Sequence, residues 1–161
     1  MRLLGIDPGP TESAYVIIET SDCRAIWADK LNNHALLERL LERSTHYYDH
    51  AVIEMVASYG MAVGREVFDT CVWIGRFGMA CAGGWPDHIY RRDIKLHLCG
   101  DSRAKDTNIR QALVDRFAPG QRNHGKGTKA DPGWFYGFHS DLWQAYALAV
   151  TAADQHEGRQ P

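Results

Sequence analysis

The chain has 161 residues, 45% of them hydrophobic, and a formal net charge of −2, which suits one globular domain with a substantial core. It has no apolar run near the roughly 20 residues of a membrane helix and no charged-then-apolar leader, so we expect a soluble cytoplasmic protein without a membrane partner. Its four cysteines are scattered and lack CxxC spacing, which argues against a zinc site and favours reduced thiols.

The first stretch, residues 3–18, consists of two apolar runs separated by a Pro-Gly-Pro turn, and it predicts a β-hairpin. Gly5 leaves room for another backbone or a ligand to come close to the first strand. Asp7 lies where this strand meets the turn, and a carboxylate in a buried strand is costly unless its charge is compensated. We therefore interpret Asp7 as a metal ligand. The alternative is a turn aspartate that only hydrogen-bonds its own backbone.

Residues 23–31 predict a third strand, and the leucines that follow at intervals of three and four predict a helix against the sheet. This helix shows no sign of chemistry. We expect His34, His46 and His50 to be surface or strand-end residues rather than ligands.

Residues 51–56, AVIEMV, repeat the pattern of a buried strand interrupted by one carboxylate, here Glu54. The order strand, strand, strand, helix, strand is that of an α/β domain with a mixed sheet. In this order Glu54 can lie on the strand next to Asp7, so that the two carboxylates share a cation. A core glutamate satisfied by hydrogen bonds is the alternative, but the pair favours a metal.

Residues 57–64 predict a glycine-bracketed loop at the end of this strand, where α/β folds carry working residues. Tyr59 and Met61 are candidates for contact with a nucleic-acid base, although a loop tyrosine is more often a packed cap. A long helix is then expected over residues 65–82. Its predicted inward side chains are Val67, Phe68, Cys71, Val72, Ile74 and Phe77.

A short fifth strand at residues 88–90 leads into a basic region with helices predicted at 94–98 and 105–117. Residues 91–129 contain ten basic and four acidic residues, a net charge of +6, whereas the rest of the chain carries −8. This contrast indicates that one part of the molecule prefers a polyanion and another collects cations, unless the charge is merely solvated. The candidate contacts with such a polyanion are Tyr59, Arg91, Arg92, Lys95, Arg103, Lys105, Lys126 and Lys129.

The final predicted helix, residues 140–155, carries Asp141 in its first turn and Gln144 one turn later, on the same face. An acid in a first turn also suits the helix dipole and needs no metal, which is the alternative for Asp141. We find no second domain: residues 1–155 predict one domain, and 156–161 a C-terminal tail.

Three motifs in this order and spacing, GIDPG around Asp7, VIEMV around Glu54 and DLWQAYALA from Asp141, resemble the RuvC-type Holliday junction resolvases of the ribonuclease H-like superfamily. The chain is most similar to small phage-encoded members, with ASYGMAVG, YRRDIKLHLCG and SRAKD as further shared stretches. Nearly the whole chain is covered.

The resemblance implies a ribonuclease H-like α/β fold, a five-stranded mixed sheet flanked by helices. It also implies a homodimer that nicks Holliday junctions and other branched DNA with Mg²⁺ or Mn²⁺, two ions per active site, in a bacterial or phage-infected cell. Asp7, Glu54 and Asp141 match the catalytic acids of the family, while Lys95 and Lys105 fall in its DNA-facing basic segment.

The chain departs from the family pattern at two places. Bacterial members carry an acid or a histidine three positions after the third catalytic acid, where this chain has Gln144. A neutral amide is a weaker ligand for a hard cation, so we expect a loosely held second metal. The aromatic residue that the family inserts at the junction centre has no direct match, because Ala57 occupies its place and Tyr59 is the nearest substitute.

Two other functions stay open. Asp7-Pro-Gly-Pro-Thr11 is similar to a phosphate loop of the actin and heat-shock ATPase superfamily, but such phosphotransferases need two lobes. The other is a branched-DNA-binding protein whose catalysis is weak or lost through Gln144.

Overall fold

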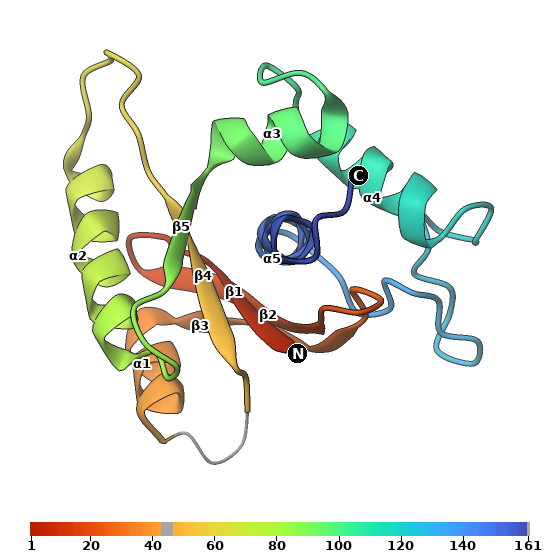
Figure 1. Cartoon of the computed structure of the whole chain (residues 1–161), viewed down its shortest axis with the longest axis horizontal. Helices are drawn as coiled ribbons and strands as arrows, with labels where there is room; N and C mark the ends of the chain where they lie inside the picture. Colours follow the sequence, from red (N-terminus) through yellow and green to blue (C-terminus); the bar gives the residue numbers. More distant parts are fainter. Residues whose placement is uncertain (43–46, 161) are drawn as a thin grey trace.

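The structure is a computed structural model, and it describes residues 1–42 and 47–160. Five strands and five helices follow one another along these residues (Figure 1). The strands are β1 (Arg2–Asp7), β2 (Glu12–Glu19), β3 (Ala25–Asn32), β4 (His50–Met55) and β5 (Asp87–Tyr90). The helices are α1 (Asn33–Glu42), α2 (Arg65–Ala80), α3 (Arg91–Cys99), α4 (Asp106–Phe117) and α5 (Leu142–Glu157).

The five strands form one mixed sheet in the order β3-β2-β1-β4-β5. The β1–β2 and β2–β3 pairs are antiparallel, whereas β1–β4 and β4–β5 are parallel. The predicted five-stranded mixed sheet is therefore confirmed. Its central strand is β1, so the end of β1 lies beside the end of β4.

Strand alternation divides the core into two layers (Figure 1). Leu3 and Val52 point to the layer that contains α3, α4 and α5, which we call the α5 face. Leu4, Ile6 and Ile53 point to the opposite layer, beneath α1 and α2. Because side chains alternate, Asp7 and Glu54, each next to an isoleucine of the second layer, belong to the α5 face.

The close approach of α5 to the sheet depends on Gly5. A Cβ atom at Gly5 would lie 2.8 Å from the carbonyl oxygen of Ala145 and 2.9 Å from Cβ of Ala149. The helix is alanine-rich and buried along nearly its whole length, so its backbone can lie directly over β1. The expectation that another backbone comes close to Gly5 is thus confirmed.

A buried carboxylate ties the three helices of the α5 face together. Asp154 of α5 is fully buried, and it accepts hydrogen bonds from Arg116 of α4 at 2.6 and 2.8 Å. His97 of α3 lies 2.9 Å from the same carboxylate, and Arg159 donates to it at 3.1 Å. Burial raises the pKa of Asp154, but the hydrogen bonds from Arg116, His97 and Arg159 outweigh it and hold the pKa below its usual value. Nothing in the sequence pattern marked this residue.

Several predicted boundaries and one helix face were wrong. The third strand begins at Ala25 rather than residue 23, because Cys23 adopts a left-handed conformation (φ 61°). The long helix ends at Ala80, and the helix predicted over 94–98 already begins at Arg91. Of the apolar side chains predicted to point inward from α2, only Ile74 and Phe77 are buried.

The reason is that α2 carries two apolar stripes and the core can cover only one. Trp73, Ile74 and Phe77 fill the core, whereas Phe68, Val72 and Met79, spaced by four and seven, are 60%, 53% and 78% exposed. Among the described residues, no helix is both long and apolar enough to cross a bilayer.

Candidate functional site

The first part of the site is built by the ends of the two central parallel strands. Ile6 of β1 pairs with Ile53 of β4, and Asp7 and Glu54 are the next residues on these strands. The turn after Asp7 is fixed by other groups: the Gly9 N–H donates to Ser13 Oγ at 3.2 Å, and Asn33 Nδ2 donates to the Gly9 carbonyl at 2.9 Å. The turn therefore does not depend on a hydrogen bond to the Asp7 side chain.

The second part comes from the start of α5. Asp141 is the N-cap residue of this helix, but its side chain makes no capping hydrogen bond. Its carboxylate instead pairs with Lys30 of β3 at 2.8 Å. The helix-dipole explanation of Asp141 is weakened by this orientation. One turn later, the side-chain oxygen of Gln144 is buried and lacks a hydrogen-bond partner within the described residues.

The electrostatics of the site identify Asp7 as its centre. Burial is the largest cause that raises the pKa of Asp7, from 3.8 to about 8, and the negative charges of Glu54, Asp141 and Asp106 add to it. The positive charge of Arg91 opposes the rise. Carboxylates from β1, β4 and the start of α5 thus act on one another.

Glu54 is neutralised from α3. Its side chain is 13% exposed, and burial raises its pKa, while the guanidinium of Arg91 lowers it. Arg91 Nη1 donates to Glu54 at 3.0 Å, and Nη2 donates to Asp106 at 3.0 Å. Lys95, one turn further along α3, also lowers the pKa of Glu54. Two of the predicted DNA contacts, Arg91 and Lys95, therefore border the acidic residues.

The donor atoms fit a hard divalent cation. Three carboxylates and an unpartnered amide oxygen offer only oxygen ligands, which Mg²⁺ prefers. The carboxylates lie less close together than the potential ligand atoms of His50, Asp87 and His156, which among the described residues all lie within 4.8 Å of one another. Glu54 and Asp141 instead pair with Arg91 and Lys30.

The raised pKa of Asp7 predicts an unusual dependence of stability on pH. The native state keeps this proton up to about pH 8, whereas an unfolded aspartate loses it near pH 3.8. The native state therefore binds more protons across this window, so the free energy of unfolding should fall as pH rises through it. In thermal melts with EDTA at pH 8.5, the melting temperature of Asp7→Asn should exceed that of the native sequence by about 3 °C or more. At pH 5 this difference in melting temperature should be smaller.

The matched control for this measurement is Asp93→Asn, which removes an exposed acid of α3. Its melting temperature should follow that of the native sequence at both pH values. A lower stability of Asp7→Asn at pH 8.5 would contradict the electrostatic description of the site.

The remaining predicted DNA contacts are distributed over the surface. Arg92, Arg103, Lys105 and Lys129 are exposed, and Lys126 is half-buried. Tyr59 follows β4 in a loop, has a left-handed backbone (φ 48°) and is 57% exposed. Their contact with DNA stays a prediction. Sequence reasoning missed Lys30 and Asp106, which meet the acidic residues only through long-range pairing.

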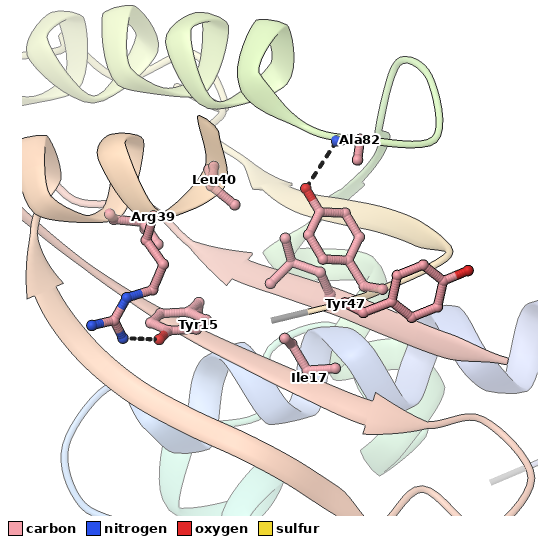
Figure 2. A pocket seen from close by; sticks show the side chains of 9 residues that line it. Tyr15, Ile17, Arg39, Leu40, Tyr47 and Ala82 are labelled. Carbon is pink, nitrogen blue, oxygen red and sulfur yellow. Dashed lines mark hydrogen bonds between the residues drawn. The ribbon is translucent and has the colours of Figure 1, made fainter. Parts of the chain in front are cut away.

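An apolar cavity of about 160 Å³ lies on the other side of the sheet and is not part of this site (Figure 2). Leu4, Ile17 and Leu40 contribute to its lining, and Arg39 donates to the Tyr15 hydroxyl at 2.5 Å. Its lining residues belong to the layer beneath α1 and α2, whereas Asp7 and Glu54 face the opposite layer. His46, predicted as a surface residue, lies outside the described residues.

Comparisons with known proteins give a clear result for the fold. No family model matches the sequence, and no curated protein sequence matches it either. Among solved structures, that of Thermus thermophilus RuvC is similar, with a TM-score of 0.71 at 17% identity, covering 99% of this chain and 98% of that one. T. thermophilus RuvC in complex with a Holliday junction substrate is similar with a TM-score of 0.67 at 16% identity and the same coverage. The chain thus has the RuvC type of ribonuclease H-like fold, as its motifs predicted.

Proposed function

We propose that the protein is a RuvC-type, metal-dependent, structure-selective endodeoxyribonuclease that nicks Holliday junctions and other branched DNA by phosphodiester hydrolysis. The observation that carries this proposal is the position of Asp7: a half-buried carboxylate at the end of the central strand of a RuvC-type fold, whose pKa is strongly raised by desolvation and by the charges of Glu54 and Asp141. A junction-bound RuvC with this fold over 99% of the chain supports the substrate class.

Some of the site residues would bind metal ions, and others would balance charge. Asp7, Glu54 and Asp141 would hold two divalent ions, Mg²⁺ or Mn²⁺. Such ions would supply an activated water and charge stabilisation for a phosphodiester displacement. Gln144 offers its unpartnered oxygen as a hydrogen-bond acceptor at the same end of α5. Lys30 and Arg91, which pair with two of the acids, are available for the scissile phosphate once the acids have other partners.

Branched DNA would be held by the basic segment. Arg92, Lys95, Arg103 and Lys105 belong to α3 and the turn that precedes α4, and Arg91 at the start of α3 reaches the acidic site. Phosphate contacts of this kind position a duplex without reading its sequence. The exposed Tyr59 is suited to stack on a base at a distorted junction.

Cleavage of two opposing strands requires two sites, so we propose a homodimer. The exposed apolar stripe of α2, Phe68, Val72 and Met79, supports it. An apolar groove between α1 and α2 adjoins this stripe and includes the 60%-exposed Leu41. Apolar side chains gathered in one place on a surface are typical of an interface, and a second copy of the chain satisfies the symmetry of the reaction.

Val72→Glu should convert such a dimer into a monomer, because it places a charge in the apolar stripe. Sedimentation velocity at micromolar concentration measures the change directly. The matched control, Asp69→Asn, alters an exposed side chain of the same helix outside the stripe and should leave the dimer intact. A monomeric native protein would contradict the dimer but not the metal site.

The experiment that tests the proposed function is a nicking assay on a labelled four-way junction with Mg²⁺ and with Mn²⁺. Cleavage of the junction but not of a linear duplex of the same sequence is expected. One alternative is favoured by a specific observation: Gln144 stands where bacterial members of the family that the chain resembles carry an acid or a histidine, so the protein could bind branched DNA with weak or lost catalysis. Junction binding without nicking in either metal would establish that alternative.

Gln144→Asp should lower the Mg²⁺ concentration needed for half-maximal nicking by about tenfold, because a carboxylate is a stronger ligand for a hard cation than an amide. A titration of nicking rate against Mg²⁺ measures this. Gln144→Glu is the second variant, since it carries the charge on a side chain of the original length. Unchanged metal dependence in both would mean that Gln144 only packs.

A further inference from the structure

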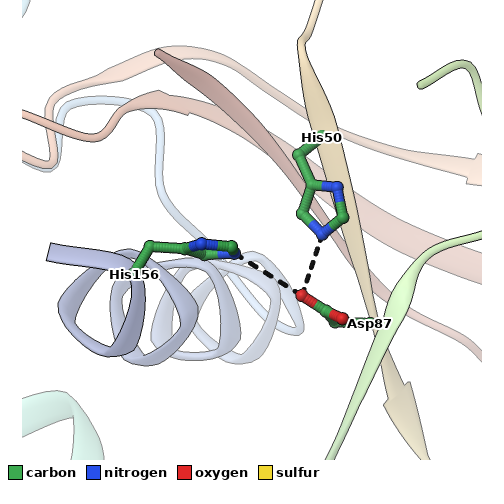
Figure 3. A group of neighbouring side chains, drawn as sticks. All are labelled: His50, Asp87 and His156. Atoms are coloured by element: carbon green, nitrogen blue, oxygen red, sulfur yellow. Dashed lines mark hydrogen bonds and ion pairs between the residues drawn. The ribbon is translucent and has the colours of Figure 1, made fainter. Parts of the chain in front are cut away.

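A second group of potential ligands lies away from the acidic residues. It contains His50 at the start of β4, Asp87 at the start of β5 and His156 in the last turn of α5 (Figure 3). One potential ligand atom of each residue lies within 4.8 Å of the other two. His50 Nε2 is 2.8 Å from Asp87 Oδ2, and His156 Nε2 is 3.5 Å from the same oxygen.

The two imidazole rings approach this oxygen from different elements. Their centroids are 5.3 Å apart at an interplanar angle of 78°, so each ring directs a nitrogen toward Asp87 without stacking on the other (Figure 3). Asp87 and His156 also line an open cavity of about 360 Å³ together with Gln155. The group is therefore reachable from solvent, and an incoming ion has room beside it.

The group lies at the opposite end of the fold from the acidic residues. His50 begins the strand on which Glu54 lies near the end, and His156 is fifteen residues after Asp141, about 22 Å along the axis of α5. The two sites are thus separate, but they share two elements, β4 and α5, and β5 leads directly to Arg91 at the start of α3.

We propose that His50, Asp87 and His156 form a second metal site that binds Zn²⁺ and joins β4, β5 and α5. Two imidazole nitrogens and one carboxylate oxygen are an accepted zinc ligand set, with the fourth position left open. Ligands on one tetrahedral zinc ion are about 3.3 Å apart, given bonds of about 2.0 Å. Two nitrogens already lie 2.8 and 3.5 Å from the Asp87 oxygen and all three ligand atoms lie within 4.8 Å of one another, so side-chain rotations can bring them to this spacing.

The ligand types distinguish this site from the acidic one. Mg²⁺ prefers oxygen ligands, whereas imidazole favours zinc and other later first-row metals. The proposal goes against two expectations from the sequence, that His50 is no ligand and that the chain has no zinc site. Those expectations rested on cysteine spacing and on the local sequence pattern. Neither of these can reveal a contact between residues as far apart in the sequence as 50, 87 and 156.

We expect that zinc bound by these three residues would hold β5 more firmly against β4 and α5. This strand has only four residues and lies at the edge of the sheet, paired to β4 alone. A ligand that binds only the native state stabilises it, so zinc should raise the melting temperature.

The test is isothermal titration of Zn²⁺ in saturating Mg²⁺, with the Asp7→Asn variant run in parallel to remove the acidic site. Both proteins should bind one Zn²⁺, and zinc should raise their melting temperatures. His156→Gln, an exposed position, and His50→Gln should each weaken binding by more than about tenfold, the loss caused even by removing an outer-shell partner. His124→Asn is the matched control: it removes an exposed histidine outside the group, and asparagine tolerates its left-handed backbone (φ 52°).

Two results would overturn the proposal. The first is that the native protein fails to bind Zn²⁺, which would mean that the three residues form only ion pairs. The second is that His156→Gln and His50→Gln both bind zinc as tightly as the native protein does. Circular dichroism of the variants confirms that they are folded, and titration of Cys71→Ser excludes the exposed thiol as the zinc ligand.

Discussion

Asp7→Asn should reduce Mg²⁺-dependent nicking of a four-way junction by at least about a thousandfold, because several kcal/mol of transition-state stabilisation depend on the metal ions it would hold. Asparagine keeps the size of the side chain but cannot ionise, so it cannot supply the carboxylate whose pKa is raised by burial and then by the neighbouring acids. Single-turnover rates at saturating protein measure the chemical step without interference from binding.

Junction binding in a calcium-containing gel shift should persist in Asp7→Asn, since the proposed DNA contacts lie on α3, the turn before α4, and the loops. Asp93→Asn, an exposed acid of α3, is the control and should nick normally. If purified Asp7→Asn nicks at the native rate, Asp7 is not a metal ligand and the proposed function fails.

Asp154→Asn should be the most destabilising single substitution of a polar residue in the α5 face. It removes the charge on which Arg116, Arg159 and His97 converge, and it leaves two partly buried guanidinium groups without their anionic partner. Removal of one member of a buried ion network costs about 3–5 kcal/mol. For a domain of this size, the melting temperature should fall by roughly 10 °C.

The same network predicts acid sensitivity. Because the pKa of Asp154 is lower in the native protein than in an unfolded chain, its stabilisation is present above the unfolded value and disappears as pH falls through the native one. Asp154→Asn should remove that part of the acid dependence. Asp115→Asn, an exposed acid of α4, serves as control and should melt like the native protein. Equal stability of both variants would show that the network contributes no net stability.

The sequence was sufficient to predict the sheet and the approximate position of its acids. Short apolar runs around Asp7 and Glu54 predicted buried central strands, and the strand–helix order allowed these strands to be neighbours. Both follow from local periodicity, which depends only on nearby residues. The proposal that Asp7, Glu54 and Asp141 are catalytic residues rests on the motif resemblance and on the electrostatics of the site.

What the sequence could not predict are contacts between distant residues. Lys30 meets Asp141, and Arg91 meets Glu54, because β3 and α3 bring them to the ends of the central strands. A charge pattern along the chain assigned Arg91 to DNA alone. Asp154 was missed for the same reason, since a buried acid in a helix shows no signal until its partners Arg116, Arg159 and His97 are known.

Helix α5 lies against Gly5 near Ala145 and Ala149, and it carries Asp141 at one end and His156 at the other. A helix of this length behaves as a rigid rod, so a bulkier side chain at position 5 would tilt it about the contact. A tilt of about 5° would shift each end by roughly 1 Å, in opposite directions. Ion–ligand distances tolerate only about 0.2 Å. The absence of a side chain at Gly5 therefore determines where both ends of α5 lie, although Gly5 itself binds no ligand.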